Sequence, residues 1–135
     1  MSRGRPAVAV LAGLAGIAAA GCGTAADRTQ ARAATERFYA AVQHHDGRTA
    51  CAQLSPPTRA QLVKDQSEPD CAKAVLKLSL HGSRAGTVQV YATSARVALA
   101  RGDTVFLGYG QQGWRIDAVG CRPQGNGLFD CEEQA

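Results

Sequence analysis

The spacing of hydrophobic residues divides the chain into a helix-forming first half and a strand-forming second half. Between residues 29 and 45, apolar side chains recur every three to four positions, which predicts an amphipathic helix ending at Asp46-Gly47. Three shorter helices are expected to follow: one over 48–54, one that begins at Ser55-Pro56-Pro57 with Ser55 as its N-cap, and one that begins with a capping box at 67–70 and stops at His81-Gly82.

From residue 88 onward the hydrophobic period changes from helical spacing to two. Apolar and polar positions alternate in four runs separated by short polar turns, which indicates an antiparallel meander of four strands. The composition after Cys121 is that of a loop. Helices followed by strands predict an α+β fold, with the helices on one face of the sheet. The four runs centre on Val90, Val97, Leu107 and Ile116.

The first 21 residues form a leader typical of an export signal. Arg3 and Arg5 precede an uncharged, apolar run of 14 residues from Ala7 to Ala20. This run has the length of a signal-peptide core, whereas a membrane-spanning helix needs about 20 apolar residues. We therefore expect residues 1–21 to be a removable signal peptide.

The end of the leader, Ala19-Ala20-Gly21-Cys22, resembles a bacterial lipobox, in which small residues precede a cysteine that is diacylated. Ala19 departs from the motif, which more often has leucine there, and an ordinary signal-peptide cleavage is the alternative. Two acyl chains give stable anchoring. The expected arrangement is lipidated Cys22, a flexible tether over 22–29 and a domain over 30–135. Membrane lipid would hold the protein on the outer face of the cytoplasmic membrane.

The cysteine count supports export. With Cys22 set aside, four of the five cysteines remain, an even number that predicts two disulfides in an oxidising compartment. We favour Cys51–Cys71 and Cys121–Cys131, because the members of each pair are near in sequence, although three connectivities are open. The chain contains no Cys-x-x-Cys motif and no histidine at ligand spacing beside a cysteine, so neither a metal nor a cofactor is expected.

Charge argues against a nucleic-acid partner. The whole chain carries +4, but Arg3 and Arg5 belong to the leader, so the 114 residues after it carry about +2. The remaining basic residues are dispersed rather than clustered. A nearly neutral single domain lacks the basic surface that nucleic-acid binding needs.

Several segments together resemble the NTF2-like superfamily, and more closely small exported lipoproteins of high-GC bacteria. They are the helix Glu36–Val42, Ala50–Leu54 with Ser55-Pro56, and the spacing from Trp114 to Cys121 and Cys131. The resemblance implies a cone in which a curved sheet wraps a long first helix. Members include isomerases, dehydratases and cyclases, and also many binding proteins, so the fold does not decide the function.

The steroid-isomerase branch of this superfamily uses a buried tyrosine and one or two carboxyls, for which Tyr39, Asp103 and Asp117 are the candidates. Tyr39 is expected in the core, Asp103 in the Arg101-Gly102-Asp103 hairpin turn and Asp117 on the outer face. No acid–base pair follows from these positions, and the turn explains the triplet better than cell adhesion does.

The remaining candidates favour structural roles. His44 and His45 suit a helix C-terminus, and Trp114 is expected to seal one end of the sheet against the first helix. We therefore expect a non-catalytic lipoprotein that binds a small apolar molecule in the cone or another envelope protein. The alternatives are a pocket enzyme of the NTF2-like type and a transporter-associated solute-binding lipoprotein, for which a single small domain without a hinge is an unusual size.

Overall fold

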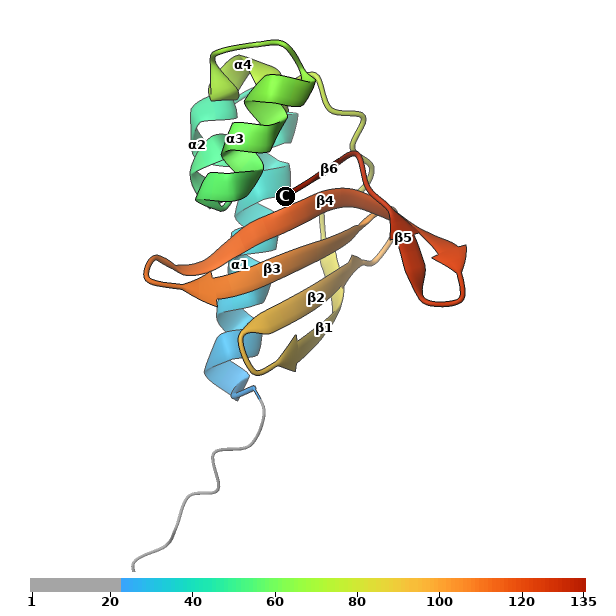
Figure 1. Ribbon diagram of the computed structural model, residues 1–135. Coiled ribbons are helices and arrows are strands. Elements are labelled where there is room, and N and C mark those ends of the chain that lie inside the picture. Colours follow the sequence, from blue (N-terminus) through green and yellow to red (C-terminus); the bar gives the residue numbers. More distant parts are fainter. Residues whose placement is uncertain (1–22) are drawn as a thin grey trace, which may run out of the picture.

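The computed structural model describes residues 23–135; the expected signal peptide and Cys22 lie outside this range. The described residues form four helices followed by six strands, with the longest helix lying across one face of the sheet (Figure 1). None of these helices combines the length and apolar character that a membrane crossing requires. The α+β class expected from the sequence is confirmed.

Helix α1 (Ala25–Gln43) begins earlier than the periodicity predicted. The Thr24 hydroxyl accepts a hydrogen bond from the Asp27 backbone N–H at 3.1 Å, and the Asp27 carboxylate accepts one from the Thr24 N–H at 2.9 Å. This reciprocal capping box starts the helix at once. The flexible tether expected over 22–29 is therefore wrong from Ala25 onward, because those residues are helical.

The three shorter helices are α2 (Gly47–Gln53), α3 (Pro56–Asp65) and α4 (Cys71–Val75). Ser55 is the N-cap of α3, as expected, but its hydroxyl pairs with the Thr58 hydroxyl at 2.8 Å instead of capping a backbone N–H. The capping box expected at 67–70 is wrong: Ser67 has a positive φ of 48°, and Asp70 alone caps α4 through the Ala72 N–H at 2.9 Å. Helix α4 also ends well before His81.

The strands form an open antiparallel sheet in the order β1-β2-β3-β4-β5, with β6 paired to β4. The four expected strands are present, but the segment after Cys121 is not a loop. It extends β4, turns at Asn126-Gly127 and returns as β5, because Asn-Gly with positive φ at both residues suits a tight hairpin. The strands are β1 (Ala85–Tyr91), β2 (Ser94–Leu99), β3 (Thr104–Gly110), β4 (Gly113–Gly125), β5 (Leu128–Asp130) and β6 (Glu133–Gln134).

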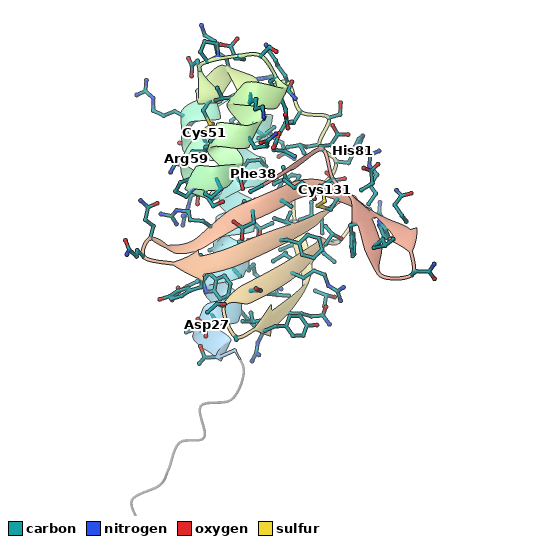
Figure 2. The ribbon with its side chains drawn as sticks, viewed as in Figure 1. Asp27, Phe38, Cys51, Arg59, His81 and Cys131 are labelled. Atoms are coloured by element: carbon teal, nitrogen blue, oxygen red, sulfur yellow. A yellow bond between two sulfur atoms is a disulfide. The ribbon has the colours of Figure 1, made fainter. Side chains whose placement is uncertain are left out.

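The core fills the space between α1 and the sheet. Phe38 of α1, Val97 of β2 and Ile116 of β4 are all fully buried in it. Two disulfides link further segments, with the pairing favoured from the sequence: Cys51–Cys71 joins α2 to α4, and Cys121–Cys131 joins β4 to the segment before β6 (Figure 2). Each closes a short loop of the kind that stabilises a small exported domain.

Candidate functional site

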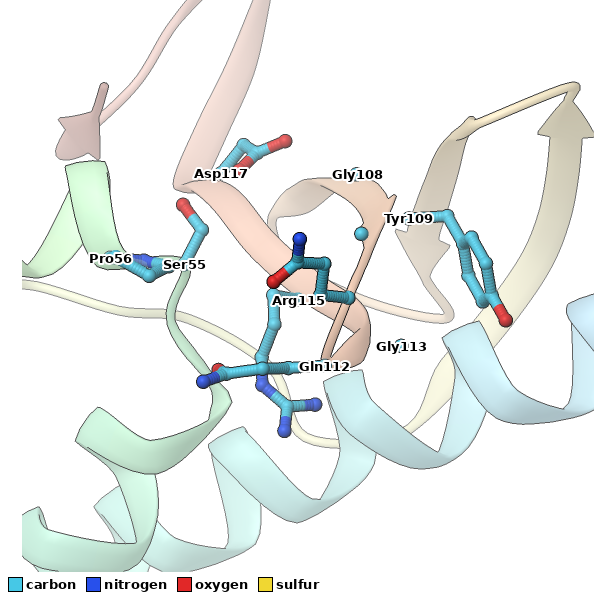
Figure 3. A pocket seen from close by; sticks show the side chains of 10 residues that line it. Ser55, Pro56, Gly108, Tyr109, Gln112, Gly113, Arg115 and Asp117 are labelled. Carbon is cyan, nitrogen blue, oxygen red and sulfur yellow. The ribbon is translucent and has the colours of Figure 1, made fainter.

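A pocket of about 360 Å³ lies beside β4, between the β3–β4 turn and the connection from α2 to α3 (Figure 3). Trp114 and Ile116 point into the core, so the residues between and beside them face the other way. The connection between α2 and α3 forms the second wall, because the Ser55 N–H donates a hydrogen bond to the Ile116 carbonyl at 2.8 Å. The lining residues are Ser55, Pro56, Gly108, Tyr109, Gly110, Gln111, Gln112, Gly113, Arg115 and Asp117.

The charged side chains of this pocket are Arg115 and Asp117. Asp117 lies over β3 where Gly108 leaves room: a methyl group at Gly108 would be 2.5 Å from the Asp117 Oδ2 atom. One terminal nitrogen of Arg115 donates to the Trp114 carbonyl at 3.0 Å, while its Nε is buried and has no hydrogen-bond partner within residues 23–135. The other guanidinium N–H groups of Arg115 are donors that can bind an anionic group in the pocket.

The space between α1 and the sheet, where the sequence analysis placed a small apolar ligand, contains buried apolar side chains. Phe38 is fully buried, as is Ile116, and Leu107 is 2 % exposed. The wall of the pocket with Arg115 combines glycines, Pro56 and Tyr109 with the charged Arg115 and Asp117. Such a wall suits a partner that has both apolar and charged groups.

A second polar cluster joins residues that the sequence analysis had kept apart. The Tyr39 hydroxyl donates to Asp103 Oδ2 at 3.2 Å, and the backbone N–H of His81 donates to the same atom at 2.7 Å. The His81 imidazole Nδ1 lies 3.9 Å from Asp103 Oδ1. Asp103 lies in the turn between β2 and β3, as expected, but its side chain is 2 % exposed and hydrogen-bonded to Tyr39 of α1.

The alternation of β3 contains the signal that places Asp103. Residues 103, 105 and 107 share one face of an extended chain, and Val105 and Leu107 are core residues. The Arg101-Gly102-Asp103 triplet masked this, because it also fits a turn. The inward position therefore follows from counting the strand period back from Val105.

Burial determines what the Tyr39–Asp103 pair can do. Tyr39 is 1 % exposed, and burial, followed by the negative charge of Asp103, raises the pKa of its phenol far above the ordinary value. The phenol therefore stays protonated, and its proton is already donated to Asp103. The pair ties α1 to the start of β3 and to the segment before β1, and it leaves no hydroxyl directed at a substrate. Asp103 also borders an open pocket of about 350 Å³ that His81 and Arg122 help to line.

The other candidates from the sequence take structural positions. Trp114 is 3 % exposed, and its indole N–H donates to the Asp27 carboxylate at 3.4 Å, so it closes one end of the sheet against α1 as expected. His44 is the C-cap residue of α1, and both His44 and His45 are exposed. Over residues 23–135, no three histidine, cysteine or carboxylate side chains gather where they could hold a metal ion.

Glu133 is a buried carboxyl that the sequence analysis missed. It is 2 % exposed, and neither of its carboxylate oxygens has a hydrogen-bond partner among the described residues. Its strand pairs it with Val119 of β4, whose side chain is fully buried, so Glu133 faces the interior beside α3. Burial and the nearby charge of Asp65 raise the pKa of Glu133 to about 7.

We expect this carboxyl to make folding stability pH-dependent. A folded-state pKa near 7, against an ordinary value of 4.5, means that the folded protein binds the proton more tightly. The stabilisation is therefore complete below pH 4.5 and is lost as the pH rises through 7. Urea unfolding should give a larger free energy at pH 5 than at pH 8, and Glu133→Gln should flatten this difference. Exposed Glu132→Gln is the control; an equal pH dependence in wild type and E133Q would contradict the assignment.

The comparisons with known proteins add no relative. No family model matches the chain, and neither the curated proteins nor the solved structures contain a match. The class of the protein therefore rests on its own architecture: a disulfide-linked α+β domain with an open, six-stranded antiparallel sheet over residues 23–135.

Proposed function

We propose that the chain is a bacterial cell-envelope lipoprotein, anchored through acylated Cys22 to the outer face of the cytoplasmic membrane, and that its domain acts by binding. The observation that carries this proposal is the cysteine pairing. All four cysteines of the described domain are joined in disulfides, which leaves Cys22 as the odd one, after three small residues and two positions before the N-cap of α1. Disulfides of this kind are typical of exported proteins.

A long helix across one face of an open antiparallel sheet supports the further proposal that the domain is NTF2-like. Within that proposal, a binding role has more support than an enzymatic role. The tyrosine and carboxyl that an isomerase would direct at its substrate are here bonded to each other and buried. A separate pocket, which Arg115 and Asp117 help to line, lies beside β4.

The partner that this pocket suits best is the carboxyl terminus of a peptide or envelope protein. Arg115 supplies guanidinium N–H donors, and Asp117 supplies acceptor oxygens for N–H groups. The volume of about 360 Å³ is at the small end of ligand pockets, which suits a few residues of chain rather than a large solute.

Binding can be tested with a tripeptide that has a free carboxyl terminus and with its amidated form. We expect only the free acid to shift the amide resonances of Gly108 and Gly110. Arg115→Lys should weaken this binding about tenfold, because lysine lacks the Nε–H and the planar fork of arginine. Arg96→Lys, on β2 outside the pocket, is the matched control. Equal responses to the acid and the amide would overturn the proposed site.

Anchoring can be tested by fractionation of Cys22→Ala. We expect the variant to leave the membrane fraction, because it lacks the thiol that carries the diacylglyceryl group, while wild type stays bound. Ala26→Ser, at an exposed position of the first turn of α1, should behave as wild type. A C22A protein that still sediments with membranes would contradict the anchor.

A further inference from the structure

We propose that one end of the domain lies directly on the phospholipid surface, with Tyr91 and Tyr109 in the headgroup region. This inference rests on the proposed lipid anchor at Cys22. The end in question, called here the anchor-proximal end, comprises the start of α1 (23–27), the β1–β2 turn (91–94) and the β3–β4 turn (109–114). The β3–β4 turn of this end also lines the pocket with Arg115, so that pocket would open beside the membrane surface.

The first argument is the absence of a spacer between the anchor and the fold. A methyl group at Gly23 would lie 2.7 Å from the Val90 Cβ, so this residue already packs against β1. Thr24 caps α1, and Ala25 is helical. Gly23 directly follows Cys22 in the sequence, so no stretch of chain separates the proposed anchor from the described fold. The membrane that holds the acyl chains would then lie close to this end of the domain.

The second argument is the register of the sheet. Tyr91 pairs with Ser94 where β1 turns into β2, and Tyr109 pairs with Trp114 where β3 turns into β4. Ser94 in turn pairs with Gly108, so both turns are at the same end of the sheet. Trp114 reaches Asp27 of α1 from this end. Figure 1 shows the start of α1 at that end, and the β4–β5 hairpin away from it.

The third argument is the chemistry of the surface. Tyr91 is 57 % exposed and Tyr109 is 51 % exposed, and tyrosine, with an apolar ring and a polar hydroxyl, is enriched at membrane–water interfaces. The exposed residues between the paired ends of the two hairpins are Ala92, Thr93, Gln111 and Gln112, none of which is charged. The tips of these two hairpins therefore carry no charge that anionic lipid would repel, and Asp27 of α1, at the same end, accepts hydrogen bonds from Thr24 and Trp114.

The opposite end of the sheet has a different character. The β4–β5 hairpin contains exposed Leu128 at its tip, and the acidic residues Asp130 and Glu132 follow it. Exposed Arg84, Arg101 and Arg122 lie at this end as well, and Arg122 forms a salt bridge with Glu132 at 3.0 Å, so net charge does not distinguish the two ends. Leu128 marks the distal end.

Energy transfer can measure this orientation, because Trp114 is the only tryptophan in the chain and lies at the anchor-proximal end. The lipidated protein is reconstituted into vesicles of phosphatidylethanolamine and phosphatidylglycerol with a dansyl-labelled headgroup lipid. Transfer from Trp114 should exceed transfer from a W114F/L128W variant, whose donor is at the distal hairpin. Equal or reversed transfer, with flotation of the vesicle-bound protein intact, overturns the orientation alone. Loss of flotation overturns the anchor and the orientation together.

A linker variant distinguishes binding of the tyrosines to the membrane from proximity that the anchor alone imposes. Inserting about 20 Gly/Ser residues between Cys22 and Gly23 gives a tether with a root-mean-square reach of about 25 Å. If Tyr91 and Tyr109 bind the surface, this variant keeps most of its transfer, and adding Y91S/Y109S lowers it. Loss of transfer in the linker variant with both tyrosines intact overturns the tyrosine contact.

Hydrogen exchange tests the same contact without any substitution in the fold. Amides of 92–94 and 110–113 should exchange more slowly in the vesicle-bound protein than in soluble C22A, whereas those of 126–127 should not change. Unchanged exchange in both anchor-proximal turns overturns the proposal.

Discussion

Replacing Gly47 with alanine should lower the free energy of unfolding by about 3 kcal/mol or more, at the upper end of the usual cost of overpacking. Gly47 is the first residue of α2, and a methyl group there would lie 1.8 Å from the Ala72 carbonyl oxygen and 2.6 Å from its carbonyl carbon. Backbone atoms cannot rotate away as a flexible side chain can. Helix α4 would have to separate from α2, yet the Cys51–Cys71 disulfide holds the two together.

Urea unfolding monitored by Trp114 fluorescence measures this loss. Gly110→Ala is the matched control, because no atom lies within 4 Å of the added methyl group. We expect G110A to unfold within about 0.5 kcal/mol of wild type, as surface substitutions usually do. A G47A protein as stable as G110A would show that the α2–α4 contact is looser than described.

Asp103→Ala should cost about 3 kcal/mol, because each buried donor left without an acceptor costs about 1–3 kcal/mol. The substitution removes the acceptor of both the Tyr39 hydroxyl and the His81 backbone N–H. The Tyr39 hydroxyl would remain in a region where Tyr39 is 1 % exposed, and the His81 N–H would lose its carboxylate acceptor beside the open pocket. The link from α1 to the start of β3 would be lost at the same time.

Tyr39→Phe is the informative partner of this variant. It removes one donor and leaves Asp103 bonded to the His81 N–H, so we expect a cost of about 1.5 kcal/mol. In a double-mutant cycle, D103A should cost less in the Y39F background than in wild type, because the phenol is no longer there to be left unsatisfied. Additive costs measured by urea unfolding would contradict the hydrogen bond.

The hydrophobic pattern was sufficient to predict those helices and strands that the local sequence determines. The amphipathic helix, the four alternating strands and the two short-range disulfides were all predicted from local spacing. Local signals were also present where the prediction was wrong, since Thr24 with Asp27 is a capping box and Asn126-Gly127 is a hairpin turn. The composition of these two segments is typical of flexible chain, and it led to the prediction of a tether over 22–29 and a loop after Cys121.

The candidate sites were harder to predict because distant segments form them. The pocket exists because the α2–α3 connection lies against β4, through a hydrogen bond from Ser55 to Ile116. Tyr39 and Asp103 are 64 residues apart, and only the path of α1 across the sheet brings them together. Glu133 is buried because β6 returns to β4, and two residues of strand are too few for periodicity to reveal.

The most direct measurement of the central claim is the intact mass of the protein extracted from membranes. The account predicts a chain that begins at residue 22 and carries a diacylglyceryl group on Cys22. Its mass should also correspond to two disulfides among the other four cysteines. A chain cut at another position, or one that begins at Cys22 with an unmodified thiol, would contradict the lipid anchor and the membrane orientation inferred from it.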